Sequence, residues 1–184
     1  IIIYNWIDFI RTKPYRDLFR FHEFQYINYK NTQDIINKIK DMTGREFEFF
    51  CANLFKLTNQ YKKIKLTSAT NDEGKDIILT DMNDNITYVE CKRYTDKATK
   101  TENFMIGREL CQKFVGAMVA YNIKNGIIIT TGNIHQNAWD YIFTLEKNSD
   151  IKLNILNTQD VKKMLIHIKD KQTNTIKSED IKDM

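Results

Sequence analysis

Two carboxylates and one lysine stand at the ends of two neighbouring segments with strand-like patterns. Asp76 opens one apolar run, and Glu90 and Lys92 end the next. Because side chains alternate along a strand, Glu90 and Lys92 share one face and Cys91 takes the other. A hairpin that turns near residues 84–85 would pair position 76 with position 91. We therefore expect the two carboxylates and the ammonium group to converge.

Such a cluster is suited to hold a divalent cation, because neighbouring like charges repel unless a cation binds between them. Mg²⁺ prefers oxygen ligands and keeps several waters. Asp76, Glu90 and the backbone carbonyl of Cys91 would supply oxygen ligands. Lys92 would orient a water and stabilise its hydroxide form, which is the chemistry of in-line attack on a phosphodiester. The alternative interpretation is a solvated salt bridge at a sheet edge.

Other sets of reactive residues are scattered. His22, His135 and His167 occur singly, and the three cysteines follow no metal-binding or disulfide spacing. We interpret the histidines as packing or capping residues and the cysteines as small core residues in a reducing compartment. No glycine-rich phosphate-binding loop is present, which argues against ATP use by this chain.

The elements that must position the cluster alternate between helical and strand patterns. Apolar residues at three- and four-residue steps predict helices, and alternation or short β-branched runs predict strands. The predicted order from residue 44 is αβββαβαβα, which favours an α/β fold with a mixed central sheet and helices on both faces. The helices are predicted at 32–42, 44–58, 103–122, 134–147 and 157–168, and the strands at 61–67, 76–80, 86–92, 126–130 and 151–156.

The composition is that of one globular domain with a short appendage. The 184 residues carry a formal net charge of +4, and 42% of them are hydrophobic and 28% charged. No run reaches the ~18 apolar residues of a membrane span, so we expect a cytoplasmic protein. The chain opens on Ile1 without an initiator methionine. We therefore expect either a fragment of a longer chain, with a further region before Ile1, or a processed chain, and a membrane anchor in a missing N-terminal segment stays an open alternative.

Five short motifs, taken together and in order, resemble the Mrr-type catalytic domain of restriction endonucleases, within the PD-(D/E)xK nuclease superfamily. The resemblance covers about residues 43–168. It implies a nuclease domain at 43–169 with a restriction-endonuclease-like αβββαβ core. Apolar spacing predicts an N-terminal helical extension at 1–42, and a polar, charged composition predicts a C-terminal tail at 170–184. The motifs are residues 44–48 (GREFE), 72–76 (DEGKD), 90–94 (ECKRY), 112–118 (QKFVGAM) and 127–132 (IIITTG), the last followed by Asn137 and Ala138.

The resemblance implies a role for each matching residue. Asp76 and Glu90 match the family's metal ligands, and Lys92 matches its catalytic lysine. Glu48 matches an acidic residue on the first helix that reaches the metal directly or through water. Gln112 matches a glutamine near the site. Lys75 stands where the superfamily name would put proline, and the metal argument does not depend on that position.

The implied activity is Mg²⁺-dependent hydrolysis of DNA, with Mn²⁺ as a substitute, in a restriction or phage-defence effector. Cutting both strands needs two sites, so we expect a homodimer or a higher oligomer. A repair or junction-resolving nuclease of the same superfamily and a non-catalytic nucleic-acid-binding module are the alternatives. The basic residues expected to follow the phosphate backbone are Lys92, Arg93, Lys97, Lys100 and Arg108.

Overall fold

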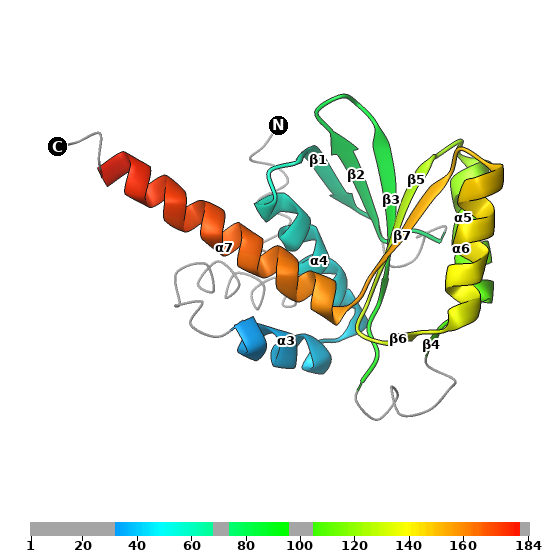
Figure 1. The fold of residues 1–184 in the computed structure, drawn as a ribbon, viewed down its shortest axis with the longest axis horizontal. Helices are drawn as coiled ribbons and strands as arrows, with labels where there is room; N and C mark the ends of the chain where they lie inside the picture. Colours follow the sequence, from blue (N-terminus) through cyan, green and yellow to red (C-terminus); the bar gives the residue numbers. More distant parts are fainter. Residues whose placement is uncertain (1–31, 68–73, 96–104, 181–184) are drawn as a thin grey trace.

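The protein is described from a computed structural model, in which residues 32–67, 74–95 and 105–180 are placed. A mixed five-stranded sheet lies between two layers of helices (Figure 1). The elements are α3 (Thr32–Asp41), α4 (Gly44–Leu57), β1 (Tyr61–Leu66), β2 (Ile77–Asp81), β3 (Ile86–Lys92), β4 (Met105–Ile106), α5 (Arg108–Ala120), β5 (Asn125–Thr130), β6 (Asn133–Ile134), α6 (Gln136–Asn148), β7 (Lys152–Leu156) and α7 (Thr158–Asp180).

The sheet has the order β1-β2-β3-β5-β7. Strands β1, β2 and β3 are antiparallel neighbours, whereas β3, β5 and β7 run parallel. Helices α5 and α6 lie on the connections between the parallel strands, as parallel pairing requires. The predicted α/β class, the mixed sheet and the helices on both faces are therefore confirmed.

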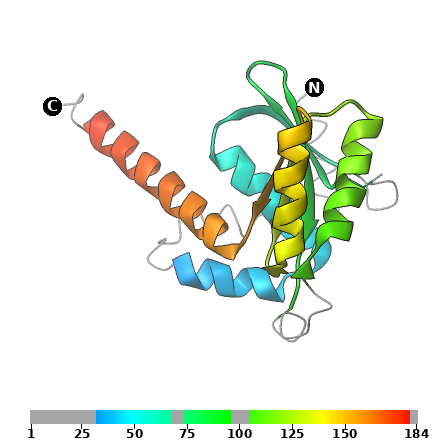
Figure 2. The same cartoon turned by 45° about the vertical axis from the view of Figure 1, so that its right-hand side comes forward.

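Each face of the sheet has its own apolar core. On one face, α3, α4 and α7 cover a core that includes Phe50, Leu54 and Leu165. On the other face, α5 and α6 cover a second core that includes Phe114 and Met118 (Figure 2). Because α3 contributes buried isoleucines to the first core, this part of the predicted N-terminal extension packs with the domain predicted at 43–169.

Gly126 of β5 explains how closely α5 approaches the sheet. A Cβ atom at this position would lie 2.5 Å from the Met118 sulfur and 2.9 Å from a Phe114 ring carbon. A larger residue here would force the Met118 and Phe114 side chains to move, so glycine allows the close packing of this helix on the strand.

Two element boundaries differ from those predicted, and one pair of short strands was not predicted. The helix predicted from residue 103 begins at Arg108, and it follows the two-residue strand β4. Strands β4 and β6 form a separate parallel pair that is too short to leave an alternating pattern. The last helix continues to Asp180 instead of ending near residue 168, because the sequence 158–180 contains neither glycine nor proline.

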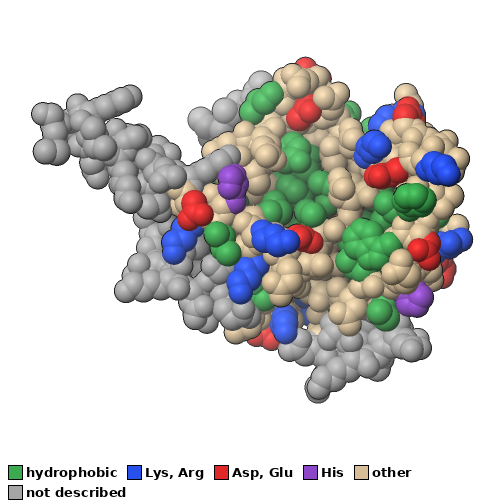
Figure 3. Space-filling model, viewed as in Figure 1, with side chains coloured by type: hydrophobic (Ala, Val, Ile, Leu, Met, Phe, Trp, Pro, Cys, Tyr) green, Lys and Arg blue, Asp and Glu red, His purple; other side chains and the backbone are tan. Residues whose placement is uncertain are grey.

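The face seen in Figure 3 carries acidic and basic side chains interspersed, with hydrophobic side chains reaching the surface between them. Trp139 and Phe143 of α6 are among the exposed hydrophobic residues, at 41% and 72% relative exposure. None of the helices in the placed part of the chain combines the length and the apolar character that crossing a bilayer would take.

Candidate active site

The hairpin of β2 and β3 sets the position of the charged cluster. Ile77 pairs with Val89, so the register places Asp76 beside Glu90, one residue away from the predicted partner at 91. The difference comes from the turn at residues 82–85, in which Asp84 adopts the left-handed conformation (φ 67°). The Asp81 carboxylate accepts from the Asn85 N–H at 2.9 Å and closes this loop.

Asp76 is held firmly and buried, with 8% relative exposure. Its Oδ2 accepts a hydrogen bond of 2.7 Å from the Cys91 N–H, and its own N–H donates to the Val89 carbonyl at 2.8 Å. On the other side, the Thr67 N–H donates to the Asp76 carbonyl at 2.9 Å, and the Thr67 hydroxyl donates to the Lys75 carbonyl at 2.8 Å. Asp76 is therefore fixed between β1 and β3.

Glu90 and Lys92 share one face of β3 and form an ion pair, with 2.5 Å between Lys92 Nζ and Glu90 Oε1. The second oxygen, Glu90 Oε2, is buried and accepts no hydrogen bond from the placed residues. Burial lowers the pKa of Lys92, but the hydrogen bond and charge of Glu90 and the charge of Asp76 outweigh it and raise the pKa above its usual range. Lys92 is therefore an ammonium ion at neutral pH, a source of positive charge and not a base.

The carboxylates of this cluster carry more negative charge than the protein balances. Burial is the largest cause that raises the pKa of Asp76, to about 7; the charges of Glu90 and Glu48 add to it, and the Cys91 N–H and Lys92 act against it. An unpartnered buried oxygen and a carboxyl group that resists ionisation together fit a site for a divalent cation.

No three carboxylate, histidine or cysteine side chains in the placed parts of the chain gather closely enough to hold an ion by themselves. Mg²⁺ is suited to such a site, because it is usually held by one or two carboxylates together with water and phosphate oxygens. Asp76 and Glu90 supply those carboxylates.

Glu48 approaches the cluster from α4. The capping box of Thr43 and Glu46 fixes the start of this helix. Glu48 is half-buried and pairs with Arg45, at 2.5 Å between Arg45 Nη1 and Glu48 Oε2. Its charge reaches Asp76, since it helps to raise the pKa of that carboxyl group. The structure thus brings Glu48 near Asp76. The Glu48 carboxylate also forms an ion pair with Arg45.

A cavity of about 400 Å³ opens beside Glu90 and Lys92. Tyr94 and Met105 line it from the chain that follows β3, and Leu110 and Lys113 line it from α5. Gln112 is exposed on α5 and does not line this cavity. On α5, Lys113 therefore lines the cavity and Gln112 does not.

The remaining predicted phosphate-contacting residues differ in position. Arg93 is partly buried, and its Nη1 donates to the Lys40 carbonyl at the end of α3, 3.2 Å away. This contact ties α3 to the strand that carries Lys92. Arg108 is exposed at the start of α5. Lys97 and Lys100 lie outside the described residues.

The interpretation of the histidines as packing or capping residues is confirmed at His135. His135 is the N-cap of α6, where its Nδ1 accepts from the Asn137 N–H at 3.1 Å. His167 is exposed on α7, and His22 lies outside the described residues.

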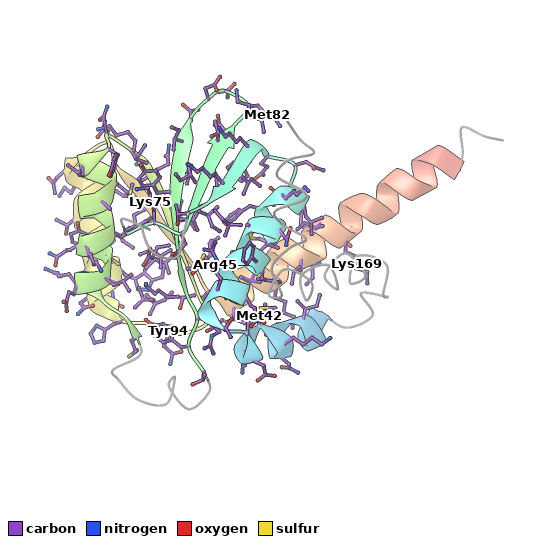
Figure 4. The ribbon with its side chains drawn as sticks, turned by 180° about the vertical axis from the view of Figure 1, so that it is seen from behind. Met42, Arg45, Lys75, Met82, Tyr94 and Lys169 are labelled. Atoms are coloured by element: carbon purple, nitrogen blue, oxygen red, sulfur yellow. The ribbon has the colours of Figure 1, made fainter. Side chains whose placement is uncertain are left out.

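Lys75, next to Asp76, is a buried lysine whose environment the sequence did not reveal. Its ammonium lies 5.0 Å from the centre of the Tyr88 ring and 4.3 Å from that of Tyr121. Figure 4 shows Lys75 on the α5 side of the sheet, with Tyr94 below it and Arg45 on α4. These contacts anchor the segment before Asp76 to the end of α5.

Replacing Tyr121 by alanine should lower the free energy of unfolding by about 1 kcal/mol, because a buried ammonium loses one of its two aromatic partners. Tyr121→Phe keeps the ring and should stay within about 0.5 kcal/mol of the wild type. Urea denaturation followed by circular dichroism measures both. Equal losses in the two variants would show that the hydroxyl, and not the ring, matters.

The raised pKa of Asp76 predicts a pH-dependent stability in EDTA. In the unfolded chain this carboxyl ionises at its ordinary pKa of 3.8, whereas in the folded protein it keeps its proton up to about pH 7. The folded state therefore binds more protons between these values, and the free energy of unfolding should fall by up to a few kcal/mol as the pH rises from about 4 to about 7. Asp76→Asn should flatten this slope. An unchanged slope in that variant would assign the effect to other groups.

Comparisons with known proteins found one family model and a solved structure that match this chain. A family model described as restriction endonuclease, Mrr_cat, matches residues 39–165. One similar solved structure is the MspJI restriction endonuclease in complex with a 27-mer oligonucleotide, at 14% sequence identity and a TM-score of 0.50. The match covers 72% of this chain but only 30% of the MspJI chain, and it shows a shared fold. No curated protein sequence matches the chain.

Proposed function

Because the chain belongs to the Mrr_cat restriction endonuclease family, we propose that it is a Mg²⁺-dependent endonuclease that hydrolyses phosphodiester bonds in DNA. The family assignment supports a nuclease. The metal, the DNA substrate and the residues that act on it are our proposal, and they rest on the cluster of Asp76, Glu90 and Lys92.

The observation that carries the proposal is the charge arrangement at the ends of β2 and β3. Two carboxylates lie side by side, one of them with a buried oxygen that has no partner among the placed residues. An ammonium group pairs with the other oxygen of Glu90. A salt bridge that served stability alone would satisfy both oxygens of a buried carboxylate, since an unpartnered one costs about 1–3 kcal/mol.

In the proposed mechanism, Asp76, Glu90 and the Cys91 carbonyl hold Mg²⁺, with Mn²⁺ as a substitute. Glu48 assists directly or through water. When bound, the ion would polarise a phosphoryl oxygen and lower the pKa of water. The Lys92 ammonium supplies positive charge that orients the attacking water and stabilises negative charge as it develops on oxygen. Gln112 is exposed in this structure, and in this mechanism it assists by contacting the substrate.

We also propose that the chain works on duplex DNA as a homodimer or higher oligomer, with residues 43–169 as the nuclease unit. Its role would be restriction or phage defence in the cytoplasm. Lys92, Lys97, Lys100 and Arg108 would follow the phosphate backbone. Arg93 would act mainly through its contact with α3. Two copies would place one site on each strand.

Supercoiled plasmid provides the test. Purified protein should convert it to nicked and linear forms in Mg²⁺ or Mn²⁺, and not in EDTA. Comparing plasmid with and without base methylation examines the defence role, since a restriction enzyme discriminates between them. Cleavage at the same rate in EDTA would reject the metal-dependent mechanism, and equal cutting of both plasmids would argue against the defence role.

A further inference from the structure

The cavity beside the cluster has two walls of different origin. Glu90 and Lys92 come from β3, and Glu109, Leu110 and Lys113 come from α5. Its volume of about 400 Å³ falls in the range of about 300–1,000 Å³ that is usual for small-molecule sites. The cavity is therefore large enough to admit a part of the substrate next to the reacting bond.

Helix geometry decides which residues of α5 face the cavity. Successive residues are turned by about 100°, so positions 109, 110, 113 and 114 fall on one side of the helix. Gln112 falls on another side and is exposed. The basic residue that α5 presents to the cavity is thus Lys113.

Lys113 has a free ammonium group. It forms no hydrogen bond or ion pair within the placed residues, whereas Lys92 is paired with Glu90. A lysine without a partner at the edge of a cavity is available to an anionic ligand. Because carboxylates stand on both walls, Glu90 and Glu109, a ligand with several negative charges is disfavoured. A phosphodiester carries one negative charge, which one lysine balances.

We propose that this cavity binds one nucleotide adjacent to the scissile phosphate, with Lys113 contacting the phosphate of that nucleotide. The sugar and base lie against Leu110, Met105 and Tyr94, since the cavity offers apolar and aromatic surface there. This inference rests on the proposed function, because it takes the scissile phosphate to lie at Asp76 and Glu90.

The test measures binding separately from cleavage. Short DNA duplexes are titrated in EDTA with the wild type, Lys113→Ala, Lys113→Arg and the matched control Lys147→Ala, which removes an exposed lysine from the end of α6. Lys113→Ala should reduce the slope of log Kd against log salt concentration by about 1. Lys113→Arg should restore it, and Lys147→Ala should leave it unchanged.

Modified duplexes locate the contact. A single neutral methylphosphonate is moved along the strand, and at one linkage it should weaken wild-type binding several-fold while leaving Lys113→Ala unaffected. An abasic residue at the same nucleotide should also weaken wild-type binding, because the base leaves the cavity.

Equal penalties for the wild type and Lys113→Ala at every linkage would overturn the phosphate contact. An abasic residue without effect would overturn the placement of the base. Failure of the proposed function is distinct, since it appears as wild-type protein that binds these duplexes but cleaves none in Mg²⁺.

Discussion

Replacing Asp76 by alanine should abolish Mg²⁺-dependent DNA cleavage, with a rate loss on the order of 10³-fold or more. A bound metal ion contributes several kcal/mol to charge stabilisation in the transition state, and each 1.36 kcal/mol is a factor of ten in rate. Asp76 is central among the proposed ligands because it is buried beside Glu90 and held by the Cys91 N–H.

The measurement is plasmid nicking under single-turnover conditions, with Asp150→Asn as the matched control. Asp150, just before β7, is exposed and pairs with Lys124, just before β5, so that variant should cleave as the wild type does. Thermal unfolding of Asp76→Ala in EDTA separates a lost ligand from a lost fold. A folded Asp76→Ala protein that cleaves at the wild-type rate would reject Asp76 as a metal ligand.

Replacing Lys92 by methionine should reduce cleavage by about 10²–10³-fold, because the ammonium that stabilises developing negative charge is lost. A second effect should accompany it. Lys92 lowers the pKa of Asp76, so its removal should raise that pKa further. The Asp76 carboxyl group must lose its proton to solvent before it can bind a metal, and it then does so only at higher pH. The pH–rate profile in Mg²⁺ should therefore shift to higher pH.

Lys92→Arg keeps the charge and should retain part of the activity without the shift in the pH profile. Lys56→Met removes an exposed lysine at the end of α4 and serves as the control. A loss of rate in Lys92→Met with no change in the pH profile would mean that Lys92 does not act on Asp76 as described.

Much of the fold followed from patterns that depend on local sequence. The β-branched run of β5 and the alternating pattern of β3 predicted strands in the right places. The spacing of Phe47, Phe50 and Leu54 predicted the buried face of α4. These patterns are readable because a central strand and an amphipathic helix each bury a regular subset of side chains. Strands β4 and β6 were missed because two residues cannot show a period.

The candidate site was predictable in its members but less so in its geometry. The register of β2 and β3 depends on the left-handed conformation of Asp84, and one residue of loop length moved the partner of Asp76 from 91 to 90. The aromatic contacts of Lys75 are tertiary contacts, which no local pattern encodes. The Arg45–Glu48 pair is different, because it joins residues three apart on one helix, a spacing that the sequence shows. The choice of Lys113 over Gln112 depends on how α5 is rotated against the sheet.

The central claim is that Asp76 and Glu90 bind one divalent ion, and a crystal of the protein grown with Mn²⁺ tests it most directly. Anomalous scattering recorded near the manganese edge should show a single strong peak within ligand distance of both carboxylates and the Cys91 carbonyl. Glu90 Oε2, the oxygen without a partner, should be among the ligands. A well-ordered crystal with saturating Mn²⁺, no peak between Asp76 and Glu90, and the Glu90–Lys92 ion pair unchanged would contradict the account.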